Sequence, residues 1–288
     1  MRERATDPSL MTTLMSKPFP KKSVVWKGAI LGGIVNATMT AQTSDYAYAQ
    51  HWAGNDYGLN GADGRNGFVC FEGGPWTLEG RLVGVFFSAH SPRSPFHTDG
   101  YDIEVFFRGC PTFQRTLAEK VMHPAMEFFG KGIETPCITA AFWDEGDSLI
   151  AADPWEEVVD NGVDLIENQL LDDVELAYAA WQEAYGMSAE QVEFVKSLFQ
   201  RKMAQPRTPF EITDAELRWL QSTFEDPKQK YLQIAHLMEI SREKKEEKPI
   251  DLKWLDSIDR EAEHQKAMEQ SYERFAAIGI LVSERKSG

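Results

Sequence analysis

One short segment gathers the residue types that hydrolytic and transfer enzymes use. Residues 90–99 read HSPRSPFHTD, so a base, a nucleophile, an anion clamp and an orienting acid lie close together in the sequence. The segment follows an apolar run and precedes a predicted helix start at Asp102, and loops in such places often carry active sites. The candidate catalytic residues are His90, Arg93, His97 and Asp99.

The spacing within this segment matches no catalytic motif. No GxSxG surrounds Ser91 or Ser94, and two prolines in so short a loop are typical of a rigid connection. The sequence therefore favours a structural or partner-contacting loop whose Arg93 pairs with an acid nearby. A hydrolase or transferase site in this loop is the alternative.

Sequence motifs for metals and nucleotides are absent. No two histidines have the HExxH spacing, and the acidic runs at residues 144–147 and 56–63 match no EF-hand loop and fit turns better. Gly32-Gly33 lacks the third glycine and the acidic residue of a dinucleotide fingerprint, and no GKS or GKT occurs. We therefore expect neither a metal nor another cofactor.

The strongest compositional feature is a long stretch without positive charge. No Lys or Arg lies between Lys131 and Lys196, whereas the same stretch holds 16 Asp and Glu, in a chain of formal net charge −15. A field of this sign repels nucleic acid phosphates and anionic membrane surfaces, and it attracts basic molecules. The sequence therefore predicts no direct nucleic acid binding and no membrane binding.

We predict that carboxylates of this stretch form a recognition face for a basic protein partner. A cytoplasmic binding protein of bacterial character, such as an immunity protein or inhibitor, would use such a face to capture, inhibit or regulate its partner. The alternatives are a solvated acidic surface matched by Lys and Arg from elsewhere in the fold, and a structural subunit of a larger assembly. The candidate binding residues are Asp144, Glu145, Asp147, Glu156, Glu157, Asp160, Asp164 and Glu167.

The first half of the chain has the pattern of strands and turns. We predict a flexible arm over residues 1–23 and an α+β domain over residues 24–152, in which short apolar runs alternate with Gly, Asn and Asp. Two antiparallel hairpins are predicted, one pairing residues 68–71 with 82–89 and one pairing 138–143 with 149–152. A helix is predicted over residues 103–129, broken near Pro111 and Pro124.

The second half has helical spacing. We predict a helical region over residues 153–245, which begins with one helix of about 30 residues whose apolar stripe runs from Trp155 to Trp181. Its expected N-cap is Asp153, with Glu156 completing a capping box. Further helices begin at the Ser188/Gln191 and Thr213/Glu216 capping boxes, and another covers residues 228–245.

Residues 246–288 are predicted to form a linker and a terminal amphipathic helix. We expect this helix to pack on the core of its own chain, with a homodimer through the same helix as the alternative.

Cysteine usage and hydropathy point to the cytoplasm. Cys70, Cys110 and Cys137 lie far apart and form no CxxC, which fits a reducing compartment. The apolar run at residues 29–41 is interrupted by Asn36 and Thr38 and is shorter than a membrane span. We interpret it as a buried strand or helix rather than a secretory signal.

Overall fold

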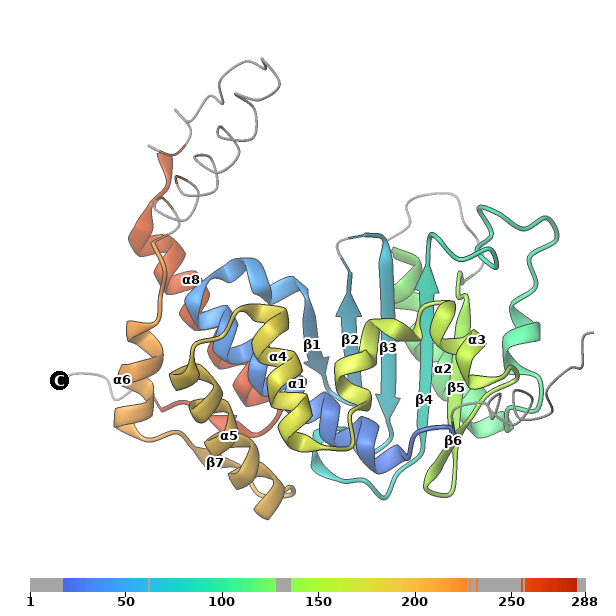
Figure 1. The fold of residues 1–288 in the computed structure, drawn as a ribbon, viewed down its shortest axis with the longest axis horizontal. Coiled ribbons are helices and arrows are strands. Elements are labelled where there is room, and N and C mark those ends of the chain that lie inside the picture. Colours follow the sequence, from blue (N-terminus) through green and yellow to red (C-terminus); the bar gives the residue numbers. More distant parts are fainter. Residues whose placement is uncertain are drawn as a thin grey trace, which may run out of the picture.

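The computed structural model describes residues 18–61, 63–127, 136–226, 228, 232, 255 and 257–283. Its fold is α+β, as the sequence predicted, with an antiparallel sheet and a largely helical C-terminal region (Figure 1). Most of the predicted arm at residues 1–23, the helix predicted over 228–245 and the predicted linker lie outside the described residues.

Six strands pair in chain order to form the sheet, each antiparallel to the next. Both predicted hairpins are confirmed, since Val69 pairs with Gly84 in the first and Asp144 with Leu149 in the second. The strands are β1 (Gln50–Ala53), β2 (Asp56–Asn60), β3 (Arg65–Phe71), β4 (Leu82–Ser88), β5 (Ala140–Glu145) and β6 (Ser148–Ile150).

Alternate side chains of these strands enter two separate cores. Residues such as Tyr57 and Val69 face helix α1 (Lys22–Gln42). Their neighbours, such as Phe68, face α2 (Thr112–Glu127) and the short helix η4 (Ile103–Phe107) on the other side. The helix predicted over residues 103–129 is therefore interrupted before Pro111 as expected, but α2 continues through Pro124.

Helix α1 corrects the prediction of strands and turns from residue 24, but it confirms that the apolar run at residues 29–41 is a buried strand or helix. Seventeen of its 21 residues are buried, because the sheet and several other helices surround it. A helix buried on all sides has no polar face, so its sequence lacks the periodicity that identifies an amphipathic helix. The helix is long and apolar enough to cross a membrane, but 94% of its apolar window is covered by the rest of the fold, which is consistent with a soluble protein.

The predicted helix of about 30 residues is wrong, because the chain forms three shorter helices there. Gly162 has φ of 134°, a left-handed value that ends the first helix, and Asp173 caps the third through the backbone N–H groups of Glu175 and Leu176. The stripe still predicted burial, since Trp155, Ile166 and other members lie in the core. The three are α3 (Trp155–Asp160), η5 (Val163–Leu170) and α4 (Val174–Tyr185).

The two capping boxes predicted further along the chain are confirmed, whereas the predicted N-cap at Asp153 with Glu156 is wrong. The Ser188/Gln191 and Thr213/Glu216 boxes both form. Pro154 occupies the N-cap of α3 and its side chain has no acceptor, so Asp153 lies one residue before the N-cap, where its carboxylate accepts a hydrogen bond from Arg93. The remaining elements are η2 (Ser44–Tyr48), η3 (Gly74–Trp76), α5 (Ala189–Ala204), β7 (Phe210–Glu211), α6 (Asp214–Ser222), α8 (Arg260–Ala277) and β8 (Ile280–Leu281).

The terminal helix α8 packs along α1 within the same chain (Figure 1). Its Met268 and Phe275 are buried, and the Ser271 hydroxyl donates to the Ala37 carbonyl over 2.8 Å. Next to it, β7 and β8 form a short parallel pair. These contacts place the last turns of α8 beside β1.

Candidate functional site

The predicted catalytic residues make separate structural contacts. His90 Nε2 lies 3.0 Å from the Asp63 carbonyl oxygen, and His97 Nε2 lies 3.0 Å from that of Ala89. Arg93 donates to Asp153 over 2.7 Å and to Glu157. All three, together with Asp99, lie in the described part of the chain, where none of the four hydrogen-bonds to another.

This loop is therefore held to the sheet and to α3 by its polar side chains. The Ser91 hydroxyl donates to Asn161 Oδ1 over 2.5 Å, and Asn161 follows the last residue of α3. Arg93 and Thr98 line a hollow of about 290 Å³ beside Asp153. These contacts account for Ser91, Arg93 and both histidines of this loop without invoking a reaction.

Three of the eight predicted binding carboxylates are neutralised within the chain. The Asp144 side chain is fully buried, lies 3.2 Å from Lys22 Nζ and accepts a 2.7 Å hydrogen bond from the Leu82 backbone N–H. Glu157 pairs with Arg93 and Asp164 with Arg65. Each of these cations comes from the first 93 residues, before the acidic stretch begins.

The other predicted carboxylates do not share one helix face. Glu156 lies on α3, where it is half-buried. Four are exposed, and among the described residues no Lys, Arg or His nitrogen lies within 4.0 Å of them. They are placed on the β5–β6 turn, at the end of α3 and on η5, and they are Glu145, Asp147, Asp160 and Glu167.

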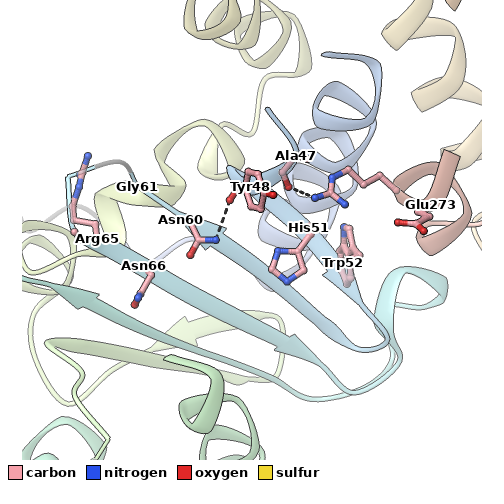
Figure 2. Close-up of a pocket in the computed structure, with 11 residues that line it drawn as sticks. Ala47, Tyr48, His51, Trp52, Asn60, Gly61, Arg65, Asn66 and Glu273 are labelled. Carbon is pink, nitrogen blue, oxygen red and sulfur yellow. Dashed lines mark hydrogen bonds between the residues drawn. The ribbon is translucent and has the colours of Figure 1, made fainter. Parts of the chain in front are cut away.

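A larger pocket, of about 750 Å³, lies over the exposed end of β1–β3 (Figure 2). Helix α2 covers the same face of the sheet further along, and residues of η2 and α8 complete the walls. The lining is formed by Ala47, Tyr48, His51, Trp52, Asn60, Gly61, Gly64, Arg65, Asn66, Glu273 and Arg274.

His51 lies over β2 because its partner across the ladder has no side chain. It pairs with Gly58, where a Cβ atom would lie 2.6 Å from the imidazole Cε1. The ring also meets the edge of Phe68, at 6.5 Å between centroids. Burial, and secondly the charge of Arg274, lower the pKa of His51, so the imidazole is neutral near neutral pH and has one donor and one acceptor nitrogen.

Arg274 brings a positive charge to the same pocket from α8. One of its terminal nitrogens donates to the Ala47 carbonyl (Figure 2), but its buried Nε has no hydrogen-bond partner among the described residues. No Asp or Glu oxygen in this part of the chain lies within 4.0 Å of its guanidinium. Burial lowers the pKa of Arg274, because desolvation opposes its charge, while nearby Glu273 acts in the other direction.

No family model matches this chain. No curated protein and no solved structure matches it either.

Sequence reasoning missed both His51 and Arg274. They lie 223 positions apart, and neither belongs to a motif. Asn60 and Asn66, which pair across β2 and β3, belong to no functional motif either. One weak sign in the sequence pointed to partial burial of Arg274, because this residue directly precedes Phe275, a core residue of the terminal helix.

Proposed function

We propose that this protein binds a small organic anion in the pocket over β1–β3. The observation that carries the proposal is the half-buried guanidinium of Arg274, which has no carboxylate within ion-pair distance among the described residues. Removing a charge from water is costly unless a counter-charge replaces the lost hydration. A bound carboxylate or phosphate would supply that charge and accept hydrogen bonds from the guanidinium.

The excess of carboxylates in this chain makes the lack of a carboxylate partner for Arg274 informative about function. The chain holds 45 Asp and Glu against 30 Lys and Arg, so a carboxylate partner for an arginine is easily supplied from within the fold. Arg65 and Arg93, for example, each pair with two carboxylates. An arginine that lies in a pocket wall without such a partner is suited to an external anion.

The rest of the pocket limits the kind of anion. Its volume of about 750 Å³ is within the range of small-molecule sites, and Tyr48, 69% exposed, adds an aromatic surface at the rim. The neutral His51 can donate to or accept from a second polar group of the ligand. Glu273 lies on the same wall and would repel a second negative group, so a monoanion with an apolar body fits best.

Thermal denaturation with three probe anions tests this proposal. Acetate, benzoate and inorganic phosphate are compared with chloride at equal ionic strength, because a ligand that binds the folded state raises the unfolding temperature in proportion to ln(1 + [L]/Kd). We expect benzoate to stabilise the protein most. A charge-assisted hydrogen bond contributes about 1.5–3 kcal/mol, so Arg274→Gln should weaken binding by roughly 10- to 150-fold.

Arg218→Gln is the matched control, since Arg218 is exposed on α6 and does not line the pocket. It should bind the probe as the unmodified protein does. If Arg274→Gln keeps the same stabilisation by the probe, or if chloride stabilises equally, the pocket is not a site for an organic anion.

Capture of a basic protein partner in the cytoplasm, as an immunity protein or inhibitor would perform it, is a second proposal. What supports it is the set of four exposed carboxylates without an ion pair among the described residues, Glu145, Asp147, Asp160 and Glu167. Reversing all four to Lys should abolish co-purification of a basic partner at low salt. Reversing Glu183 and Glu190, which are exposed on α4 and at the start of α5, should leave it intact. Equal loss in both variants would mean that overall charge, and not this set, attracts the partner.

A further inference from the structure

An apolar pocket of about 490 Å³ lies between α1, α4 and α5, which contact one another (Figure 1). It shares no lining residue with the anion pocket over β1–β3. Its volume is within the range of small-molecule sites, which are mostly apolar and hold a few polar groups. The principal apolar side chains of its wall are Val24, Trp26, Leu31, Val174, Phe199 and Met203.

Close packing at Gly28 shapes one side of this pocket. A Cβ atom there would lie 2.1 Å from the Gln169 carbonyl oxygen, so α1 approaches η5 this closely only because the residue is glycine. The chain leaves η5 immediately afterwards, and residues 171–172 line the pocket together with Gly28. The close approach therefore brings Asp172 to the same pocket as Lys27, the neighbour of Gly28 in α1.

The interior of the pocket offers apolar surface. The indole N–H of Trp26 donates to the Gly74 carbonyl over 3.1 Å, so this ring presents no unsatisfied donor to a ligand. Leu31 and Phe199 are buried, whereas Val174 is 39% exposed, so the pocket opens to solvent beside the start of α4. An apolar group that enters from water is stabilised because its surface is removed from water.

Two opposite charges lie in the lining of this pocket. They belong to Lys27 and Asp172, the only polar side chains among its lining residues. Both are exposed, and within the described part of the chain neither has an ion-pair partner within 4.0 Å, so they do not pair with each other. Asp173, the next residue, instead caps the backbone of α4 and does not line the pocket. One group of each sign is therefore left for a ligand.

We infer that this pocket binds a free α-amino acid with an apolar side chain, such as leucine. The ligand carboxylate pairs with Lys27, its ammonium pairs with Asp172, and its hydrocarbon side chain enters the apolar interior. A zwitterion is complementary to this pair of charges, because each of its groups meets one of opposite sign. Each ion pair alone is weak at an exposed position, so binding depends on both pairs and on the buried side chain together.

Ligands that carry one charge or none are less complementary to this pocket. A fatty acid would place its carboxylate near Asp172 as well as Lys27, and an alkyl amine would place its ammonium near Lys27. An apolar side chain of a partner protein carries neither charge, so it would leave both lining charges unused. A free amino acid is a small ligand that carries both charges next to an apolar group.

Nuclear magnetic resonance of the intact chain, labelled with ¹³C at its methionine methyl groups, tests the assignment. Met203 lines the pocket, and its signal is identified by its loss in Met203→Leu. We expect L-leucine to shift the Met203 signal in a saturable way, which also gives the affinity. Met268, which is buried on α8 and does not line this pocket, is the internal control and should not move.

Four analogues separate the parts of the ligand. 4-Methylpentanoate lacks the ammonium of leucine and 3-methylbutylamine lacks its carboxylate, so each should bind roughly 3- to 5-fold more weakly, as expected for the loss of one exposed ion pair. L-Alanine lacks most of the side chain and should bind roughly 10-fold more weakly or worse. N-acetyl-leucinamide lacks both charges and represents a leucine within a partner protein. It should also bind roughly 10-fold more weakly.

Two variants at exposed positions assign the charges. Lys27→Gln should weaken leucine binding by roughly 3- to 5-fold without weakening that of 3-methylbutylamine. Asp172→Asn should weaken leucine binding to the same extent without weakening that of 4-methylpentanoate. Lys21→Gln and Glu190→Gln are the matched controls, since both residues are exposed and lie outside the lining, and they should bind leucine as the unmodified protein does.

The assignment is overturned if leucine gives no saturable shift of the Met203 signal. It is also overturned if an analogue with one charge or none binds as well as leucine, or if Lys27→Gln and Asp172→Asn both keep full affinity. Arg274→Gln should leave leucine binding unchanged, which separates this test from that of the anion pocket.

Discussion

Folding buries the side chain of Lys202 completely. Replacing Lys202 by methionine tests how much this buried cation lowers the free energy of unfolding. Its side chain is 0% exposed on α5, and its Nζ donates to the Pro206 carbonyl over 2.7 Å. The ammonium lies 4.3 Å from the centroid of the Trp76 ring. Among the described residues, no carboxylate oxygen lies within 4.0 Å of it.

Burial lowers the pKa of Lys202 from 10.5 to about 8, and this fixes the sign of the effect. Between these two values the unfolded chain binds more protons than the folded one, so stability rises with pH through this range. Below the lower value the folded state carries the full cost of a buried charge, which is about 3 kcal/mol. Methionine removes that cost but forfeits one hydrogen bond of about 1 kcal/mol.

We therefore expect Lys202→Met to be more stable than the unmodified protein by about 2 kcal/mol near pH 7. Between about pH 7 and about pH 9.5 the unmodified protein should regain about 2 kcal/mol from this lysine, so the difference should nearly vanish. Urea denaturation at the two pH values measures both free energies of unfolding. Lys27→Met, at an exposed position of α1, controls for the loss of one surface charge.

A variant that is less stable at both pH values would refute this reasoning. The hydrogen bond to Pro206 and the contact with Trp76 would then outweigh the cost of burying the ammonium. A stability difference that does not change with pH would also refute it, because the protonation of Lys202 would then not be linked to folding.

Three other predictions concern pH, packing and capping. Burial lowers the pKa of His51 below 6.5, so just below pH 6.5 the unfolded chain binds more protons than the folded one. The free energy of unfolding should therefore fall as the solution is acidified through pH 6.5. His51→Gln should reduce this pH dependence. Gly32→Ala should destabilise the fold by about 1–3 kcal/mol in urea denaturation, because the new methyl group would meet the Tyr57 hydroxyl; a loss below about 0.5 kcal/mol would mean that the Tyr57 side chain can shift. Ser188→Ala should cost about 1 kcal/mol through loss of the N-cap bond to Gln191, whereas Ser188→Asn should retain most of the stability.

Local signals predicted local structure well in this chain. The two hairpins follow from turn residues and apolar runs that are neighbours in sequence, and the capping boxes at Ser188 and Thr213 depend on residues three positions apart. The helix predicted from Trp155 to Trp181 failed because periodicity was given more weight than one glycine. Gly162 ended the first helix, while the apolar residues beyond it were still buried.

Contacts between distant segments could not be read from the sequence. The acidic stretch was predicted to form a recognition face, with matching by Lys and Arg from elsewhere in the fold as the alternative. Lys22, Arg65 and Arg93 do reach it from the first third of the chain, and the sequence alone could not identify them. The anion pocket also depends on contacts between distant segments, since β1 supplies His51 and α8 supplies Arg274. Neither residue belongs to a sequence motif that would distinguish it from an ordinary surface side chain.

The cations of this protein therefore fall into two groups with different consequences. Lys22, Arg65 and Arg93 join the N-terminal elements to the acidic segment, so their charges are satisfied by folding itself. Arg274 and Lys202 also lose water on folding. Among the described residues each donates to a backbone carbonyl but gains no carboxylate, and burial lowers the pKa of both. Lys202 is sealed and can only reduce stability, whereas Arg274 lies in an open pocket where a ligand can restore the balance. Accessibility, and not charge alone, is what makes Arg274 the functional candidate.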